Sequence, residues 1–269
     1  MNSLLGFPPP DYTRRRVEII IEADAGALAD RAAQIVLGEL ARKPNLVLGL
    51  ATGKTPVGLY ERLRKSPELF AQVRFFNLDE FHGLAPSNPD SFNYFFYHHL
   101  LNHVKFEAKN VYLFRGDLKD FEEESRIVED RIKVVGGIDL QILGIGRNGH
   151  VGFNEPGSSL GSRTRAKTLE PDTVAHYAGA GKTPPNHAIT MGVGTIMEAR
   201  KCLMLASGAD KADIICRMVE GPIMSEVPAT ALQMHPRAIV VLDEAAASKL
   251  KRRDFYKWVF ANKWRVGQK

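Results

Sequence analysis

LVLGLATGKTP (residues 46–56) runs from a continuous apolar segment into a turn of threonine, glycine and lysine, and then reaches a proline. An uninterrupted apolar run of this length is typical of a strand buried on both faces of a parallel sheet. Proline is tolerated in the first turn of a helix, so a helix is expected to begin near Pro56. The segment therefore predicts a strand, a turn and a helix, which is the repeating unit of an α/β fold.

The same alternation of strands and helices continues along the chain. Asp24 is a suitable N-cap for the first expected helix. The pattern predicts one Rossmann-like α/β domain over residues 1–269, with a largely parallel sheet flanked by helices, an irregular start (1–15) and a basic C-terminal helix (249–269). Further strands are expected over 17–21, 74–79, 111–114, 139–146, 187–191, 201–206 and 238–242, and helices over 25–42, 57–64, 91–101, 121–134 and 210–220.

The composition is that of an ordinary globular protein. Hydrophobic residues make up 44% of the 269 residues and charged residues 25%, which excludes a disordered or collagen-like chain. Residues 249–269 carry eight basic residues and one acid, while the rest of the chain is mildly acidic. We interpret this basic stretch as the solvated face of a helix, because cations are favoured near helix C-termini. No nucleic-acid partner is therefore expected.

The N-terminus and the cysteines indicate where the chain works. The start, MNSLLGFPPPDYTRRR, has no long apolar stretch, and no run of about 18 apolar residues occurs in the sequence. We expect neither a signal peptide nor a membrane span. Cys202 and Cys216 are too few for a disulfide framework or a multi-cysteine zinc site, and no H-E-x-x-H spacing occurs. The sequence therefore predicts a cytoplasmic protein without a metal site.

Three polar clusters follow predicted strands, at the edge where ligands gather in open parallel sheets. The first cluster consists of Thr52, Gly53, Lys54 and Thr55. Backbone N–H groups at a helix start, together with the lysine and two hydroxyls, favour an anion such as phosphate. The spacing from Gly49 to Gly53 is one residue shorter than in a P-loop, so a nucleotide triphosphatase is not predicted. An ordinary strand–helix turn is the alternative.

The second cluster is the adjacent pair Asp79 and Glu80 in FFNLDEF (residues 75–81). Neighbouring side chains of an extended chain point to opposite sides, so only one carboxylate is expected to enter a given pocket. Partial burial raises the pKa of a carboxyl group, which makes it a better general base. The alternative is a helix cap or a surface turn.

The third cluster is GIGRNGHVGFNEPG (residues 144–157), in which the glycines at positions 144, 146, 149 and 152 allow tight turns. His150 and Glu155 lie close in sequence on this expected loop, with Asn148 nearby. Histidine titrates near neutral pH, which suits proton transfer, and a carboxylate bonded to one ring nitrogen would set its tautomer. A purely structural histidine is the alternative.

The combination of motifs resembles the glucosamine-6-phosphate deaminases, in order from about residue 17 to residue 242. The most specific motif is GxNGHxGFNEP. The related 6-phosphogluconolactonases have a similar Gly-His turn but usually follow it with a different run, so Glu155 favours the deaminase branch. The segments that carry the resemblance are LGLATGKTP, FFNLDEFHGL, GIGRNGHVGFNEPGSSLGSRTRAKTL, AITMGVGTIMEA, SGADKA and ALQMHP.

The resemblance implies a role for each catalytic candidate. Asp79 would move a proton between C2 and C1 of the open-chain amino sugar. His150 would open the pyranose ring, and Glu155 and Asn148 would orient and tune His150. The implied reaction converts glucosamine 6-phosphate and water to fructose 6-phosphate and ammonia. It needs no cofactor, because the substrate amine itself forms the imine.

The resemblance also implies binding sites for sugar phosphates. Lys211 would bind the substrate phosphate together with the loop from Thr52 to Thr55. Ser158, Arg165 and Lys167 match residues that bind an allosteric sugar phosphate in hexameric members, so a homo-oligomer is possible. The family commonly has an arginine at the substrate phosphate where this chain has Gly179. The sequence therefore leaves open which amino-sugar phosphate is the substrate.

Two other functions remain open at this point. One is a 6-phosphogluconolactonase-like hydrolase, and the other is a non-catalytic sugar-phosphate sensor on the same fold. The intact set of Asp79, His150 and Glu155 argues against the sensor.

Overall fold

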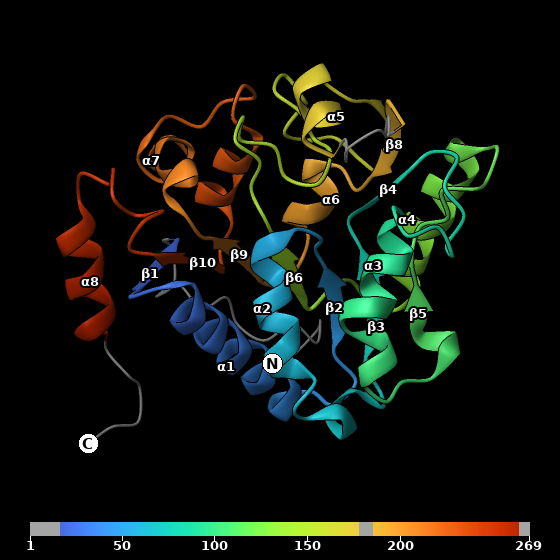
Figure 1. The fold of residues 1–269 in the computed structure, drawn as a ribbon, viewed down its shortest axis with the longest axis horizontal. Coiled ribbons are helices and arrows are strands. Elements are labelled where there is room, and N and C mark those ends of the chain that lie inside the picture. The colour runs from blue at the N-terminus through green and yellow to red at the C-terminus, as the bar shows by residue number, and fades with distance from the viewer. Residues whose placement is uncertain (1–16, 178–184, 264–269) are drawn as a thin grey trace, which may run out of the picture.

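The strand ending at Leu50 lies inside a seven-stranded parallel sheet with the order β1-β10-β9-β6-β2-β3-β5. The computed structural model describes residues 17–177 and 185–263. Helices lie around this sheet, as Figure 1 shows. The strands of the large sheet are β1 (Glu18–Glu22), β2 (Val47–Leu50), β3 (Arg74–Asn77), β5 (Val111–Tyr112), β6 (Leu140–Leu143), β9 (Cys202–Ala206) and β10 (Ala238–Asp243).

The observed helices agree well with the expected ranges for α1 and α4. Asp24 caps α1 as expected, because its Oδ1 accepts a hydrogen bond from the Ala27 N–H at 2.9 Å. The α-helices are α1 (Ala25–Arg42), α2 (Lys54–Leu63), α3 (Phe92–His99), α4 (Phe121–Val134), α5 (Pro171–Tyr177), α6 (Val193–Met197), α7 (Ala212–Glu220) and α8 (Arg253–Ala261). Short 3-10 helices cover Pro67–Phe70, Leu101–His103, Ala108–Asn110, Ala209–Lys211 and Pro228–Met234.

The core is continuous around the central strands. All four residues of β2 and of β6 are buried, as the apolar runs predicted. Helix α1 packs across β1, β9 and β10 and beside α2. Because this packing holds the start of α2 near the end of β2, the polar turn between them is presented at one edge of the sheet. Within the described residues, no helix has the length and apolar character needed to cross a bilayer.

A second, three-stranded antiparallel sheet was not expected. It consists of β4 (Asp79–Phe81), β8 (His187–Thr190) and β7 (Arg165–Thr168), with β8 in the middle. The strand expected over residues 74–79 is therefore two strands that belong to different sheets. Asn77 stabilises the break between them: its side chain accepts a hydrogen bond from the Phe114 N–H at 2.9 Å and donates one to the Asp79 carbonyl at 2.8 Å.

Other differences concern the second half of the chain. Strand β7 and the helices α5 and α6 had no counterpart among the expected elements. The C-terminal helix begins at Arg253, because residues 249–252 form a turn in which Glu220 accepts hydrogen bonds from the backbone N–H groups of Lys251 and Arg252. The expectation of an irregular start at residues 1–15 lies outside the described residues, as do residues 264–269.

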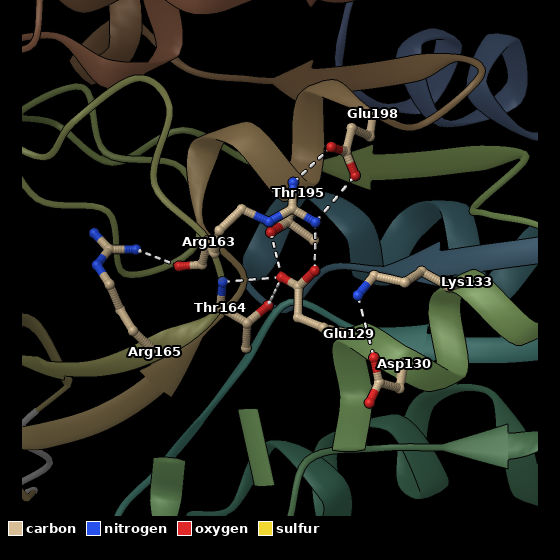
Figure 2. Close-up of polar contacts among 8 residues, drawn as sticks. All are labelled: Glu129, Asp130, Lys133, Arg163, Thr164, Arg165, Thr195 and Glu198. Atoms are coloured by element: carbon tan, nitrogen blue, oxygen red, sulfur yellow. Dashed lines mark hydrogen bonds and ion pairs between the residues drawn. The ribbon is translucent and has the colours of Figure 1, made fainter. Parts of the chain in front are cut away.

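A carboxylate on α4 connects the segments that support the small sheet. Glu129 accepts hydrogen bonds from the Thr164 N–H at 3.0 Å, from the Thr164 hydroxyl at 2.6 Å and from the Thr195 hydroxyl at 2.5 Å. Arg163 donates to both Glu129 and Glu198 (Figure 2). Glu129 thereby joins α4 to the residue before β7 and to α6.

Candidate active site

The predicted anion-binding turn lies between the end of β2 and the start of α2. Gly53 is the N-cap residue of α2, so the helix begins at Lys54. The Lys54 side chain is exposed. The Thr52 side chain is hydrogen-bonded to Tyr177, which lies at the end of α5. The turn therefore combines free helix N-terminal N–H groups with a lysine and threonine hydroxyls, as an anion site requires.

Asp79 and Glu80 point to different environments, as the alternation along a strand predicted. Glu80 is completely buried and accepts hydrogen bonds from the N–H groups of Phe81, Phe92 and Asn93 and from the Asn93 side chain. These bonds identify Glu80 as a structural anchor for the start of α3.

The Asp79 carboxylate lies against the loop that carries His150. A Cβ atom placed on Gly152 would be only 3.3 Å from Asp79 Oδ2, so glycine is what allows this close approach. Asp79 is 5% exposed. Burial, together with the nearby charge of Glu80, raises the pKa of Asp79 well above its usual value. A carboxylate with a raised pKa is suited to accept a proton near neutral pH.

His150 lies flat against the backbone of its own loop. A Cβ atom on Gly146 would be 2.3 Å from His150 Cε1 and 2.4 Å from Nε2, so only glycine fits at this position. The carbonyl of His150 accepts a hydrogen bond from the Gly146 N–H at 3.0 Å, which closes the loop. The imidazole therefore has a defined place at the end of β6.

Glu155 lies beside the imidazole, and Asn148 is hydrogen-bonded to Glu155 and to the backbone of His150. Glu155 Oε2 lies 3.4 Å from His150 Nδ1 and accepts a hydrogen bond from Asn148 Nδ2 at 2.8 Å. Burial raises the pKa of Glu155, but the contacts with His150, Thr173 and Asn148 outweigh burial and hold this pKa below its ordinary value. Glu155 is thus a carboxylate at neutral pH, next to the imidazole of His150.

Lys211 reaches the same edge of the sheet from the segment after β9. Its Nζ donates a hydrogen bond to the carbonyl of Ile145 at 2.8 Å, just before Gly146. Burial lowers the pKa of Lys211. Lys211 therefore lies beside the histidine loop, and its expected role at the substrate phosphate together with the turn from Thr52 to Thr55 stays a prediction.

The sequence interpretation missed one wall of the site, which consists of residues in or just before α5. Glu170 accepts a hydrogen bond from Asn148 Nδ2 at 3.0 Å, and Thr173 contacts Glu155. The spacing of Glu170, Thr173 and Tyr177 by three and four residues places them on one helical face. This spacing was a usable signal, but it is too common in sequences to identify a site alone.

Tyr177 connects all three predicted clusters. Its ring packs against Phe81, Phe92 and Phe153, with centroid separations of 5.3, 5.8 and 5.9 Å. Burial, followed by the charges of Asp79 and Glu155, raises the pKa of Tyr177, so its hydroxyl stays protonated. Tyr177 therefore provides a neutral hydroxyl between the anion-binding turn and the two carboxylates.

The candidate allosteric residues are Arg165 and Lys167 on β7 and Ser158, three residues after Glu155. Arg165 Nη1 donates a hydrogen bond to Asn154 Oδ1 at 2.9 Å. It also donates one to the Arg163 carbonyl at 3.1 Å, which Figure 2 shows. Arg165 and Lys167 are two residues apart on β7, so they lie on the same face of this strand, and both are half-buried. The Ser158 hydroxyl is buried and has no hydrogen-bond partner among the described residues. The structure thus connects Arg165 to the loop of Glu155 but does not join all three residues.

Two further features concern possible metal ligands and a cavity away from the candidate residues. Among the described residues, no group of three or more His, Cys, Asp or Glu side chains is arranged to hold a metal ion. A cavity of about 580 Å³ lies between α8 and the β1 edge of the sheet and contains none of the candidate residues. Gly179, which stands where an arginine was expected, lies outside the described residues.

The sequence of this chain is similar to a known protein family and to several known proteins over most of its length. Residues 22–241 match the family described as glucosamine-6-phosphate isomerases/6-phosphogluconolactonase. The chain belongs to this family. The glucosamine-6-phosphate deaminase of Hahella chejuensis is 49% identical over 257 residues, which cover 93% of this chain and 98% of the relative. Glucosamine-6-phosphate deaminase 2 of Bacillus subtilis is 43% identical, covering 89% of this chain and all of the relative.

Solved structures of the isomerase/lactonase family share the same fold. A monomeric glucosamine-6-phosphate deaminase, 35% identical, superposes with a TM-score of 0.83 and covers 87% of this chain and all of its own. The 6-phosphogluconolactonase of Trypanosoma cruzi superposes with a TM-score of 0.72 at 18% identity, covering 88% and 98% of the two chains. The lactonase likeness is one of fold alone.

Proposed function

We propose that this chain is an amino-sugar-phosphate deaminase/isomerase that converts glucosamine 6-phosphate and water to fructose 6-phosphate and ammonia. The observation that carries the proposal is that the Asp79 carboxylate lies against Gly152, in the same loop that holds the His150–Glu155 pair at the end of the central strands. The deaminase relatives at 43–49% identity support the same activity.

The chemistry begins with ring opening. His150 takes the proton of the C1 hydroxyl and returns a proton to the ring oxygen, while Glu155 and Asn148 hold the imidazole in place. The product is an open-chain aldehyde, in which the C2 proton is acidified by the adjacent carbonyl. The sugar phosphate is held by the turn from Thr52 to Thr55 and by Lys211.

Asp79 then moves a proton from C2 to C1. The raised pKa of Asp79 suits this role, because a general base works best when its pKa is near the operating pH. At the same time the amine gives up a proton and the C1 oxygen takes one, so the product has a hydroxyl on C1 and an imine at C2 formed from the substrate's own nitrogen. Water adds to this imine, and the adduct releases ammonia and leaves the ketone of fructose 6-phosphate.

One assay tests the proposal against the lactonase and the sensor. Purified protein is supplied with glucosamine 6-phosphate, with galactosamine 6-phosphate and with 6-phosphogluconolactone, and ammonia release and lactone hydrolysis are measured. We expect ammonia from at least one amino sugar and no hydrolysis above the spontaneous rate. Lactone hydrolysis without ammonia would establish the alternative enzyme, and binding without turnover would establish a sensor.

Regulation, assembly and location are proposed separately. We propose that the chain acts in the cytoplasm and that Ser158, Arg165 and Lys167 bind a second sugar phosphate in an assembly of several copies. The bond from Arg165 to Asn154, next to Glu155, supports a link between that site and catalysis. Light scattering with and without N-acetylglucosamine 6-phosphate tests the assembly; a monomer, as described for the 35% identical relative, would argue against this site.

A further inference from the structure

Both N–H groups and the carbonyl oxygen of the Asn148 side chain are hydrogen-bonded, and two of these three bonds stay within the loop of residues 144–157, which we call the catalytic loop. Its two N–H groups are directed at two carboxylates, Glu155 Oε2 at 2.8 Å and Glu170 Oε2 at 3.0 Å. Its Oδ1 accepts a hydrogen bond from the backbone N–H of His150 at 3.2 Å. Because the nitrogen faces two acceptors and the oxygen faces a donor, only one orientation of the amide satisfies every partner.

The arrangement depends on the balance of charge. Glu155 is buried and Glu170 is half-buried, and one neutral NH₂ group lies between their carboxylates. A carboxylate at position 148 would have no hydrogen to donate and would add a third negative charge at hydrogen-bond distance from the other two. The presence of Glu170 therefore requires an amide at position 148.

Glu170 also connects the catalytic loop to the start of α5. It is the residue immediately before α5, and its carbonyl accepts a hydrogen bond from the Val174 N–H at 3.0 Å. The other end of α5 carries Tyr177, whose hydroxyl is hydrogen-bonded to the Thr52 side chain. The bond from Asn148 to Glu170 thus holds the start of α5 against the catalytic loop.

We propose that Glu170 is a positioning residue for catalysis, which acts through Asn148 on Glu155 and His150, and that residues 148 and 170 form a charge-matched pair. This inference rests on the proposed deaminase function. Glu170 contacts no reacting atom; it keeps the Asn148 amide oriented, and that amide in turn holds the carboxylate that lies 3.4 Å from His150 Nδ1. The pair predicts that the consequence of a change at one position depends on the residue at the other.

A double-mutant cycle tests the pair by the rate of ammonia release from glucosamine 6-phosphate. Asn148→Asp should lower kcat at least about 100-fold, because two charge-assisted hydrogen bonds become repulsive contacts. Adding Glu170→Gln should recover at least about tenfold, because two carboxylates and one amide are present again.

Glu170→Gln alone keeps an acceptor and should stay within about threefold of wild type, whereas Glu170→Ala should lose about tenfold in kcat with little change in KM. Asp172→Asn, on an exposed position of α5, is the matched control and should leave kcat unchanged.

The outcomes separate this inference from the proposed function. Equal kcat values for Asn148→Asp and for the double variant would overturn the pair. If the wild-type protein releases no ammonia, the proposed function fails, and the pair is then judged by the thermal unfolding of the same proteins. A Tm loss in Asn148→Asp that Glu170→Gln partly reverses supports the pair, and additive Tm changes refute it.

Discussion

Asp79 lies directly opposite Thr190 in the antiparallel pairing of β4 and β8, and the Thr190 hydroxyl accepts a hydrogen bond from the Phe153 N–H at 3.0 Å. Phe153 stands between His150 and Glu155 in the catalytic loop. The Thr190 hydroxyl therefore connects the strand that pairs with Asp79 to the loop that carries His150, although Asp79 lies in the small sheet and this loop follows β6 of the large sheet.

Replacing Asp79 by asparagine should separate activity from stability. Asp79→Asn should lower kcat for ammonia release at least about 100-fold, the low end for loss of a general base, with little change in KM. Steady-state kinetics at saturating substrate measures this. A variant that keeps most of its turnover would remove Asp79 from the mechanism.

The same variant should be more stable than wild type at neutral pH. Because the folded pKa of Asp79 is raised above the unfolded value of about 3.9, its contribution to the free energy of unfolding is fully present below about pH 4 and is lost as pH rises through the folded pKa. Asparagine removes this loss. The Tm of Asp79→Asn should therefore exceed that of wild type at pH 8 and approach it near pH 4. An equal or lower Tm at pH 8 would contradict the buried-charge account.

Adding one methyl group at Gly146 should displace the imidazole of His150. Gly146→Ala would put a Cβ atom 2.3 Å from the ring, and a displacement of about 1 Å at a catalytic group can reduce the rate about 100-fold. The measurement is kcat for ammonia release. Gly38→Ala, in the middle of α1 with no atom within 4 Å of the new Cβ, is the matched control and should leave kcat unchanged. A rate for Gly146→Ala within twofold of wild type would show that the ring position is not critical.

Removing the hydroxyl of Tyr177 should affect substrate binding more than folding. Tyr177→Phe keeps the packing against Phe81, Phe92 and Phe153 but loses the bond to Thr52, so KM should rise about two- to tenfold while the Tm stays within about 2 °C. Tyr256→Phe, which removes a hydroxyl bonded to Glu220 far from the site, serves as the control. An unchanged KM in Tyr177→Phe would leave only a packing role for this residue.

Lys54 is expected to compensate for the arginine that this chain lacks at Gly179. Lys54 lies at the start of α2 beside the proposed phosphate site, and a charged hydrogen bond contributes roughly 1.5–3 kcal/mol. Lys54→Ala should therefore raise KM about ten- to hundredfold and leave kcat nearly intact. Lys65→Ala, also exposed and just beyond α2, is the control. Lys182, in the sequence Gly181-Lys182-Thr183 shortly after Gly179, is the alternative cation. An unchanged KM in Lys54→Ala, with a large rise in Lys182→Ala, would transfer the role to Lys182.

Glu129 should contribute to stability rather than to chemistry. Burial raises the pKa of Glu129, but its contacts with Thr164, Thr195 and Arg163 outweigh burial and lower it below the ordinary value. The stability from Glu129 is thus present above the unfolded pKa of about 4.3 and is lost as pH falls through the folded pKa. Glu129→Gln should lower the Tm by about 2–8 °C at pH 7, and by less at lower pH.

The neighbouring Asp130 offers a matched control for Glu129. Asp130 pairs with Lys133 on the exposed side of α4 (Figure 2), where ion pairs contribute little. Asp130→Asn should therefore change the Tm by about 1 °C or less. A similar Tm loss in both variants would mean that charge on α4, and not the hydrogen-bond network, accounts for the effect.

The sequence alone determined the strands of the large sheet, the helices α1 and α4, and the histidine cluster. The apolar runs of β2 and β6 can be satisfied only by burial on both faces, and α4 shows its amphipathic period clearly. His150, Glu155 and Asn148 could be grouped because they lie within eight residues, so a tight loop necessarily brings them together.

Only the tertiary structure decided which distant groups join that cluster. The pairing of β4 with β8 depends on contacts between residues more than 100 positions apart, and no local periodicity encodes whether two strands are parallel or antiparallel. The same holds for Glu170 and Tyr177: their helical spacing is visible in the sequence, but the surface that this face covers is set by how α5 packs. Short-range steric preferences act along the chain, whereas the burial of apolar surface that places Asp79 and Tyr177 acts between elements and becomes defined only when the whole core is assembled.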